Sequence, residues 1–138
     1  MGFERARVAR LQPANGCRVL ELITPLDWIA LVDAYPLDVT PARDEYWPGV
    51  TGGQGPWFLP DWSAVSSDYD AVHLTVLAYL SAAGRALPCQ GGTTVLAGWE
   101  PDVTYWLTDC LTQAEPPTTW INVDSDEGGR PRWTRMPK

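Results

Sequence analysis

Apolar and polar positions near the start of the chain predict a strand followed by a helix. Residues 17–23 (CRVLELI) are rich in Val, Leu and Ile, which is typical of a strand. The next four residues, Thr24-Pro25-Leu26-Asp27, have the pattern of a helix start, with Thr24 as N-cap and Asp27 at the capping-box position. Apolar residues then recur with the spacing of one helix face, at Trp28, Leu31, Val32 and Tyr35, before Pro36 ends the helix.

The run AVHLTVLAYLSAA, residues 71–83, is open to two interpretations. As a strand it has one wholly apolar face and one mostly polar face, and His73 and Thr75 lie together on the polar side. A helix ending at Gly84 is the alternative, because the length and the alanine content permit it. We favour the strand. Residues 103–111 (VTYWLTDCL) are ambiguous in the same way.

Shorter patterns complete the expected fold. We expect strands at 57–59, 93–99 and 119–123, and a short helix that begins after Asp61 as N-cap. Residues 36–56 hold four prolines and four glycines and predict a long irregular segment, which is either a binding loop or a surface excursion. Strands mixed with helices predict an α+β fold, a single domain with a mixed or mostly antiparallel sheet and two or more packed helices.

Charge is distributed unevenly along the chain. We expect a basic N-terminal tail at 1–16, a domain at 17–123 and a C-terminal tail at 124–138. Residues 19–110 carry twelve carboxylates and two arginines, which is most of the acidity behind the net charge of −7. An acidic chain is a poor candidate for nucleic-acid binding. No apolar run approaches the roughly 18 residues that a membrane span needs.

Cysteine and histidine usage bears on metals and on the compartment. The three cysteines, Cys17, Cys89 and Cys110, are odd in number and far apart. The sequence has no Cys-x-x-Cys pair and only one histidine, so we expect no metal site. Residues 1–16 lack the apolar core of a secretory signal. We therefore expect free thiols and a cytoplasmic location.

Candidate catalytic chemistry centres on His73, the only imidazole in the chain. Asp68 and Asp70 lie just before it and Thr75 just after it, and these are the components of a triad. A histidine that is hydrogen-bonded at a sheet edge is the alternative.

Two further carboxylates, Glu100 and Asp102, are on the same side of the chain if the backbone is extended there. Paired acids can perform acid–base chemistry or bind ribose hydroxyls. The alternative is a solvated turn in which Pro101 begins a helix. We predict a catalytic set of His73, Thr75, Glu100 and Asp102.

Eight tryptophans are hard to bury in so small a domain, so we expect some of them to line a pocket or a partner surface. The residues we predict to bind a ligand are Arg18, Trp47, Trp62, Tyr79, Trp99 and Trp106. No phosphate-binding glycine motif names the cofactor, because the Gly52-Gly53-Gln54-Gly55 run lacks the Lys-Ser/Thr of a P-loop.

Two segments, LPDWSAVSSDYDAVHLTVLAYLSAAGRALP and LAGWEPDVTYWL, resemble a group of small actinobacterial proteins. The resemblance covers roughly residues 20–110 and implies a source rather than an activity.

A second resemblance rests on the order of three motifs. Arg18 lies on the first expected strand, His73-Leu74-Thr75 on a middle one, and Glu100-Pro101-Asp102 follows. This order is similar to that of mono-ADP-ribosyltransferases of the Arg–Ser–Glu class, and it implies NAD as the cofactor with Arg18 at its pyrophosphate. The chain departs from that pattern because Thr75 stands alone for Ser-Thr-Ser. Asp102 also replaces the glutamate that contacts the ribose, which puts transferase activity in doubt.

Two function hypotheses follow. The first is a small cytoplasmic enzyme or ligand-binding domain with a tryptophan-lined pocket for a small molecule, with NAD as a candidate. The second is a non-catalytic acidic interaction protein, of the immunity, inhibitor or phage-encoded antagonist type, with a basic protein partner. An oligomer that buries tryptophans between subunits is a third possibility.

Overall fold

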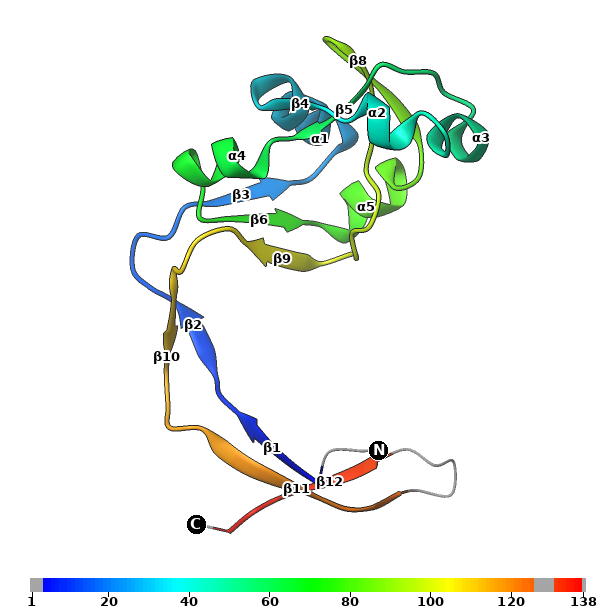
Figure 1. Cartoon of the computed structure of the whole chain (residues 1–138). Coiled ribbons are helices and arrows are strands. Elements are labelled where there is room, and N and C mark those ends of the chain that lie inside the picture. Colours follow the sequence, from blue (N-terminus) through cyan, green and yellow to red (C-terminus); the bar gives the residue numbers. More distant parts are fainter. Residues whose placement is uncertain (1–3, 126–130, 138) are drawn as a thin grey trace. The chain divides into compact units, whose positions relative to one another are not determined.

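The computed structural model describes residues 4–125 and 131–137 (Figure 1). Within these ranges it contains five helices and twelve strands, which confirms the predicted α+β class. The chain divides into two compact units. The central unit comprises residues 16–109, and the described part of the terminal unit comprises residues 4–15, 110–125 and 131–137.

The central unit contains all five helices and two small mixed sheets. Its first six elements are β3 (Val19–Leu22), α1 (Pro25–Ala34), β4 (Pro36–Asp38), α2 (Thr40–Arg43), α3 (Trp47–Thr51) and β5 (Trp57–Pro60). The next six are α4 (Trp62–Asp68), β6 (Ala71–Leu74), α5 (Val76–Ala82), β7 (Ala86–Cys89), β8 (Gly92–Val95) and β9 (Val103–Trp106). One sheet has the order β3-β6-β9 and the other β4-β5-β8-β7. The pairs β3–β6 and β5–β8 are parallel, and the other pairs in these two sheets are antiparallel.

Helix α1 begins as the sequence predicts. Thr24 is the N-cap in an extended conformation, and the Asp27 carboxylate accepts hydrogen bonds from the Thr24 backbone N–H at 2.7 Å and the Ile23 N–H at 3.0 Å. The hydrogen bond from the Thr24 backbone is the largest cause of a lowered pKa for Asp27. The predicted apolar face is buried at Trp28, Leu31 and Val32. This start is local, since every partner lies within one helical turn.

The favoured strand over 71–83 is wrong beyond residue 74. Strand β6 ends at Leu74 and helix α5 begins at Val76. Thr75 lies between them as the N-cap, and its hydroxyl accepts a hydrogen bond from the Ala78 N–H at 3.2 Å. A threonine that can cap a helix makes a short alternating run ambiguous, because it ends the extended backbone and satisfies a free N–H of the first turn.

Two other expectations are correct only in part. The irregular segment 36–56 contains β4, α2 and α3, so it is built of short elements rather than of one loop. The ambiguous run 103–111 forms strand β9 over its first four residues, and its last residue begins strand β10 of the terminal unit. The expected strands at 57–59 and 119–123 and the helix after Asp61 are confirmed.

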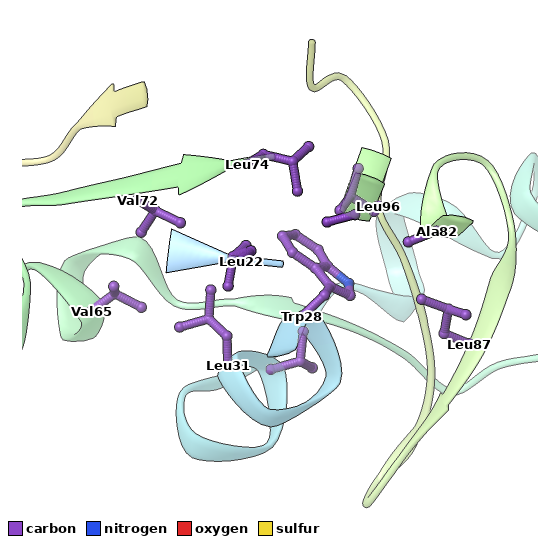
Figure 2. Close-up of a cluster of buried hydrophobic side chains, with 11 residues drawn as sticks. Leu22, Trp28, Leu31, Val65, Val72, Leu74, Ala82, Leu87 and Leu96 are labelled. Carbon is purple, nitrogen blue, oxygen red and sulfur yellow. The ribbon is translucent and has the colours of Figure 1, made fainter. Parts of the chain in front are cut away.

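The core of the central unit surrounds Trp28, whose indole lies among leucines from three strands and the leucine that follows β8 (Figure 2). Leu22 of β3, Leu74 of β6, Leu87 of β7 and Leu96 after β8 are all at most 9% exposed. The indole N–H of Trp28 donates a buried hydrogen bond to the Thr94 hydroxyl at 3.1 Å. Burial of a tryptophan is favourable only when that N–H has an acceptor, so Thr94 completes the core.

The terminal unit is built from strands β1 (Arg5–Val8), β2 (Leu11–Pro13), β10 (Leu111–Gln113), β11 (Thr118–Ser125) and β12 (Pro131–Arg135). Strands β2 and β10 form an antiparallel pair, and β1-β11-β12 form an antiparallel three-stranded sheet. Segments expected to be tails at 1–16 and 124–138 therefore contain strands. Strand β1 pairs with residues more than a hundred positions away, such as Arg5 with Ile121, so no local pattern could indicate that pairing, whereas β12 pairs with the preceding strand β11.

The expectation of three free thiols is also wrong. Cys17 and Cys110 are both disulfide-bonded, whereas Cys89 is a free thiol whose pKa is raised by burial. The number and spacing of the cysteines in the sequence do not indicate that two of them are disulfide-bonded. Among the helices in the described ranges, none has the length and apolar character needed to cross a membrane.

Candidate functional site

His73 lies on the face of the β3-β6-β9 sheet that points away from the core. Its neighbours on β6, Val72 and Leu74, are completely buried on the opposite face. In the sheet register His73 is opposite Glu21 of β3 and Thr104 of β9. Since paired residues of neighbouring strands point to the same side, the imidazole stands between a carboxylate and a hydroxyl.

The structure brings His73 and Asp102 together. The Nε2 atom of His73 is 3.6 Å from the Asp102 carboxylate, and its Nδ1 atom is 3.0 Å from the Thr104 hydroxyl. The backbone N–H of Asp102 donates to the Leu74 carbonyl at 2.9 Å, which fixes the turn before β9 beside the end of β6. The Asp102 side chain is 74% exposed, so water surrounds most of this carboxylate.

Thr104 is the hydroxyl partner that sequence reasoning missed. Thr75, the predicted partner, accepts from Ala78 and donates to the Leu22 carbonyl at 3.1 Å, so its hydroxyl is engaged in capping α5. Thr104 is 31 residues from His73 in sequence, and only the register between β6 and β9 identifies it. Glu100 is exposed before β9.

The two acids predicted to orient His73 have other partners. Asp68 accepts a hydrogen bond from the Tyr35 hydroxyl at 2.7 Å, which raises the pKa of Tyr35 to about 12. Asp70 accepts the Arg18 backbone N–H at 2.7 Å and the Thr108 hydroxyl at 2.9 Å. The hydrogen bond from the Arg18 backbone is the largest cause of the lowered pKa of Asp70.

Arg18, predicted to bind a pyrophosphate, is also held by Asp70. Its Nε atom is 3.3 Å from the Asp70 carboxylate, and a terminal nitrogen donates to the Ser67 carbonyl at 3.3 Å. These contacts join the start of β3 to the start of β6. The arrangement is suited to fixing the parallel pair of strands, and it places Arg18 with Asp70 rather than with His73.

Three of the predicted aromatic ligands pack onto the protein itself. Trp62 and Trp99 contact Trp28 with ring centroids 6.3 and 5.9 Å apart, and they lie 5.6 Å from each other. Tyr105 extends this aromatic cluster, 4.4 Å from Trp99. Trp47 lies elsewhere, edge-on to Trp57 at 5.4 Å.

The other two predicted aromatic ligands are also separate from each other. Tyr79 of α5 packs against the core, and Trp106 of β9 is opposite Ala71 in the sheet. The predicted ligand-binding residues therefore do not converge on one pocket.

Three cavities are lined by described residues, and His73 is not among the residues of their walls. The largest, about 510 Å³, is in the terminal unit between residues 115–119 and 135–137. One of about 450 Å³ is beside α2 and α3, and one of about 210 Å³ is between α1 and β3. The walls of these three cavities include none of the ten residues predicted to be catalytic or ligand-binding.

The central unit instead exposes apolar side chains where β3 and β6 end. On α5 the exposed fractions are 47% for Val76, 62% for Leu77 and 75% for Leu80. The Thr75 N–H donates to the Leu22 carbonyl at 3.1 Å, so the chain leaves the two strands side by side. This places α5 beside Ile23, which is 48% exposed, and Leu26 of α1, which is 72% exposed. We refer to these five residues as the α5 surface.

Comparisons of the chain with protein-family models, with curated proteins and with solved structures found no match. The two resemblances given above therefore stay predictions, and the functional argument rests on the geometry of the chain itself.

Proposed function

We propose that this chain is a non-catalytic binding protein whose central unit recognises a basic protein partner through the α5 surface. The observation that carries the proposal is this exposed apolar surface on the most acidic part of the chain. Patches of exposed apolar side chains with a polar rim are typical of protein interaction sites.

Charge supports a basic partner. The central unit contains twelve carboxylates and three arginines, a net charge of −9. One of these arginines, Arg18, is paired with Asp70. Asp102 lies beside the start of α5, because its N–H is bonded to Leu74. A carboxylate beside apolar anchors favours an amphipathic partner with basic residues, and the field of the whole unit accelerates its association.

The openness of the His73 site supports a binding protein over an enzyme. Acid–base groups gain most of their effect in sites from which water is excluded, where charges interact strongly. The carboxylate that contacts His73 is three-quarters exposed, and the hydroxyl predicted to react is engaged in a helix cap.

The test compares two variants of the full chain that add the same charge at equally exposed positions. Leu80→Glu changes the α5 surface, where the side chain is 75% exposed. Val50→Glu changes α3, where the side chain is 76% exposed. Neither substitution opens a cavity, since both side chains already lie in water. Each immobilised protein is incubated with lysate of the source at low salt, and the captured proteins are identified.

We expect one basic protein to bind the wild type and Val50→Glu but not Leu80→Glu. Its association rate should fall steeply as salt is raised, since screening weakens the field. The proposal fails if the captured partner binds Leu80→Glu as well as the wild type, if its association rate ignores salt, or if no partner is captured.

A second candidate function is the small-molecule site of the first hypothesis, and the contact between His73 and Asp102 is the observation that favours it. A ligand present at about 100 times its Kd stabilises the folded state by about 2.7 kcal/mol, which is several degrees in Tm. The assay is thermal unfolding with NAD and ADP-ribose. A shift that His73→Ala and Asp102→Ala abolish would favour this site, and no shift with the wild type would exclude these two ligands.

We propose a cytoplasmic location for this chain. The disulfide-bonded state of Cys17 and Cys110 weighs against it, because disulfides persist mainly in oxidising compartments. Titration of the thiols in the unfolded, unreduced protein tests the redox state of these residues.

A further inference from the structure

Among the described residues of the terminal unit, no helix covers the three-stranded sheet. Apart from residues 124, 125 and 131, whose side chains are left aside, none of the side chains described in this unit is fully buried. A sheet is stable when one of its faces packs against another layer. Within the described part of its own unit, the β1-β11-β12 sheet therefore lacks the apolar layer that a sheet of this kind requires.

One face of this sheet carries both of its tryptophans, whereas Ile121 is on the other face, where it pairs with Arg5 and Thr134. The register places Ala6 of β1 and Arg135 of β12 on either side of Trp120, and Trp133 of β12 opposite Asn122. Since paired residues share a face, Trp120 and Trp133 are on the same side of the sheet. Val8 of β1, which is 53% exposed, pairs with Thr118 on that side as well. We refer to this side as the tryptophan face. Strands β1, β11 and β12 can be followed in Figure 1.

The same face has opposite charges at its two edges. The Asn122 N–H donates to the Glu4 carbonyl at 2.9 Å, which continues the β1 register and puts Glu4 on the tryptophan face at the β1 edge. Arg135 is at the β12 edge. It pairs with Trp120, two residues along β11 from Asn122, and it donates a hydrogen bond to the Thr118 hydroxyl at 3.3 Å. Glu4 and Arg135 are both exposed.

We propose that the tryptophan face binds the tryptophan face of a second copy of this chain. The arrangement of charge on this face indicates that its binding partner is a second copy of the chain. A two-fold axis parallel to β11, lying between two stacked faces, places the β1 edge of one sheet over the β12 edge of the other. Each Glu4 then lies next to an Arg135 of the other copy, and the tryptophans of both copies fill the space between. This inference concerns the terminal unit and is independent of the proposed function of the central unit.

The experiment measures dimerisation of the full chain by sedimentation at low salt, where ion pairs are least screened. We expect the mass to rise from 15.2 kDa towards twice that value as protein concentration increases. Arg135→Glu removes two ion pairs from the dimer and introduces two repulsions, so the dimerisation Kd should rise about tenfold. Glu4→Arg should have the same effect without altering β12 or its hydrogen bond to Thr118.

The exchanged variant Glu4→Arg/Arg135→Glu restores opposite charges and should dimerise like the wild type. The matched control is Arg7→Glu, which makes the same charge change on the other side of the sheet, since Arg7 pairs with Thr119. It should leave Kd unchanged. Backbone amides of β11 should also exchange more slowly at high protein concentration.

Three results would overturn the proposal. The first is a wild type that stays monomeric up to about 0.5 mM, because a Kd above 1 mM corresponds to very weak association. The second is an equal effect of Arg7→Glu and Arg135→Glu, which would indicate a general charge effect. The third is an exchanged variant as weak as the single variants.

Discussion

The hydrogen bond between Trp28 and Thr94 makes a quantitative prediction about the central unit. Thr94→Val keeps the shape of the side chain and removes the acceptor, so the indole N–H of Trp28 is left buried without a partner. An unsatisfied buried donor costs about 1–3 kcal/mol. Burial of the added methyl group offsets a small part of this cost, so we expect the free energy of unfolding to fall by about 1–2 kcal/mol.

A double-mutant cycle isolates this interaction from other effects. Trp28→Phe removes the donor and also leaves a cavity, so we expect it to cost about 2–3 kcal/mol. In that background Thr94→Val should be neutral or stabilising, because no N–H remains to be satisfied. The coupling energy between the two positions should therefore be about 1–2 kcal/mol.

The assay is urea unfolding followed by near-ultraviolet circular dichroism, with the midpoint compared at constant slope. Thr93→Val is the control on the same strand, since the Thr93 hydroxyl donates to the Gln54 carbonyl in an exposed position where water can replace it. The reasoning is refuted if Thr94→Val changes the free energy of unfolding no more than the control does. It is also refuted if Thr94→Val costs the same in the presence and absence of Trp28.

Three other predictions follow from single residues. Asp70→Asn should destabilise the protein at pH 7. Because the folded pKa of Asp70 is lowered, its contribution is present above the unfolded value of about 3.9 and is lost as pH falls through the folded value, so urea midpoints of variant and wild type should converge as pH falls below about 4. An equal difference between the urea midpoints of variant and wild type at pH 7 and at acidic pH would contradict this. Thr75→Ala should cost about 1 kcal/mol in the same assay, with Thr75→Ser retaining most of the stability, and an unchanged Thr75→Ala would argue against the cap. Thiol titration of the unfolded, unreduced protein should detect Cys89 alone, with three thiols after reduction, whereas three thiols at the outset would restore the prediction from sequence.

The sequence by itself determined the features whose partners lie within one turn. Thr24 and Asp27 define the start of α1, and the Asp61 carboxylate accepts the Ser63 and Ala64 N–H groups at 3.0 and 3.3 Å at the start of α4. Such caps satisfy free N–H groups with neighbours in sequence, so their geometry depends little on the rest of the fold. The same holds for the acidity of the central unit, which is a property of composition.

Tertiary structure alone decided which distant residues meet. His73 and Asp102 were both predicted, but Thr104 joins them only because β6 and β9 pair in one particular register. A shift of one residue would turn Thr104 to the other side of the sheet. The pairing of β1 with β11 depends in the same way on bringing together the two ends of the chain. Closing such long loops is favoured only by the contacts made afterwards, so the register is set by packing and not by local pattern.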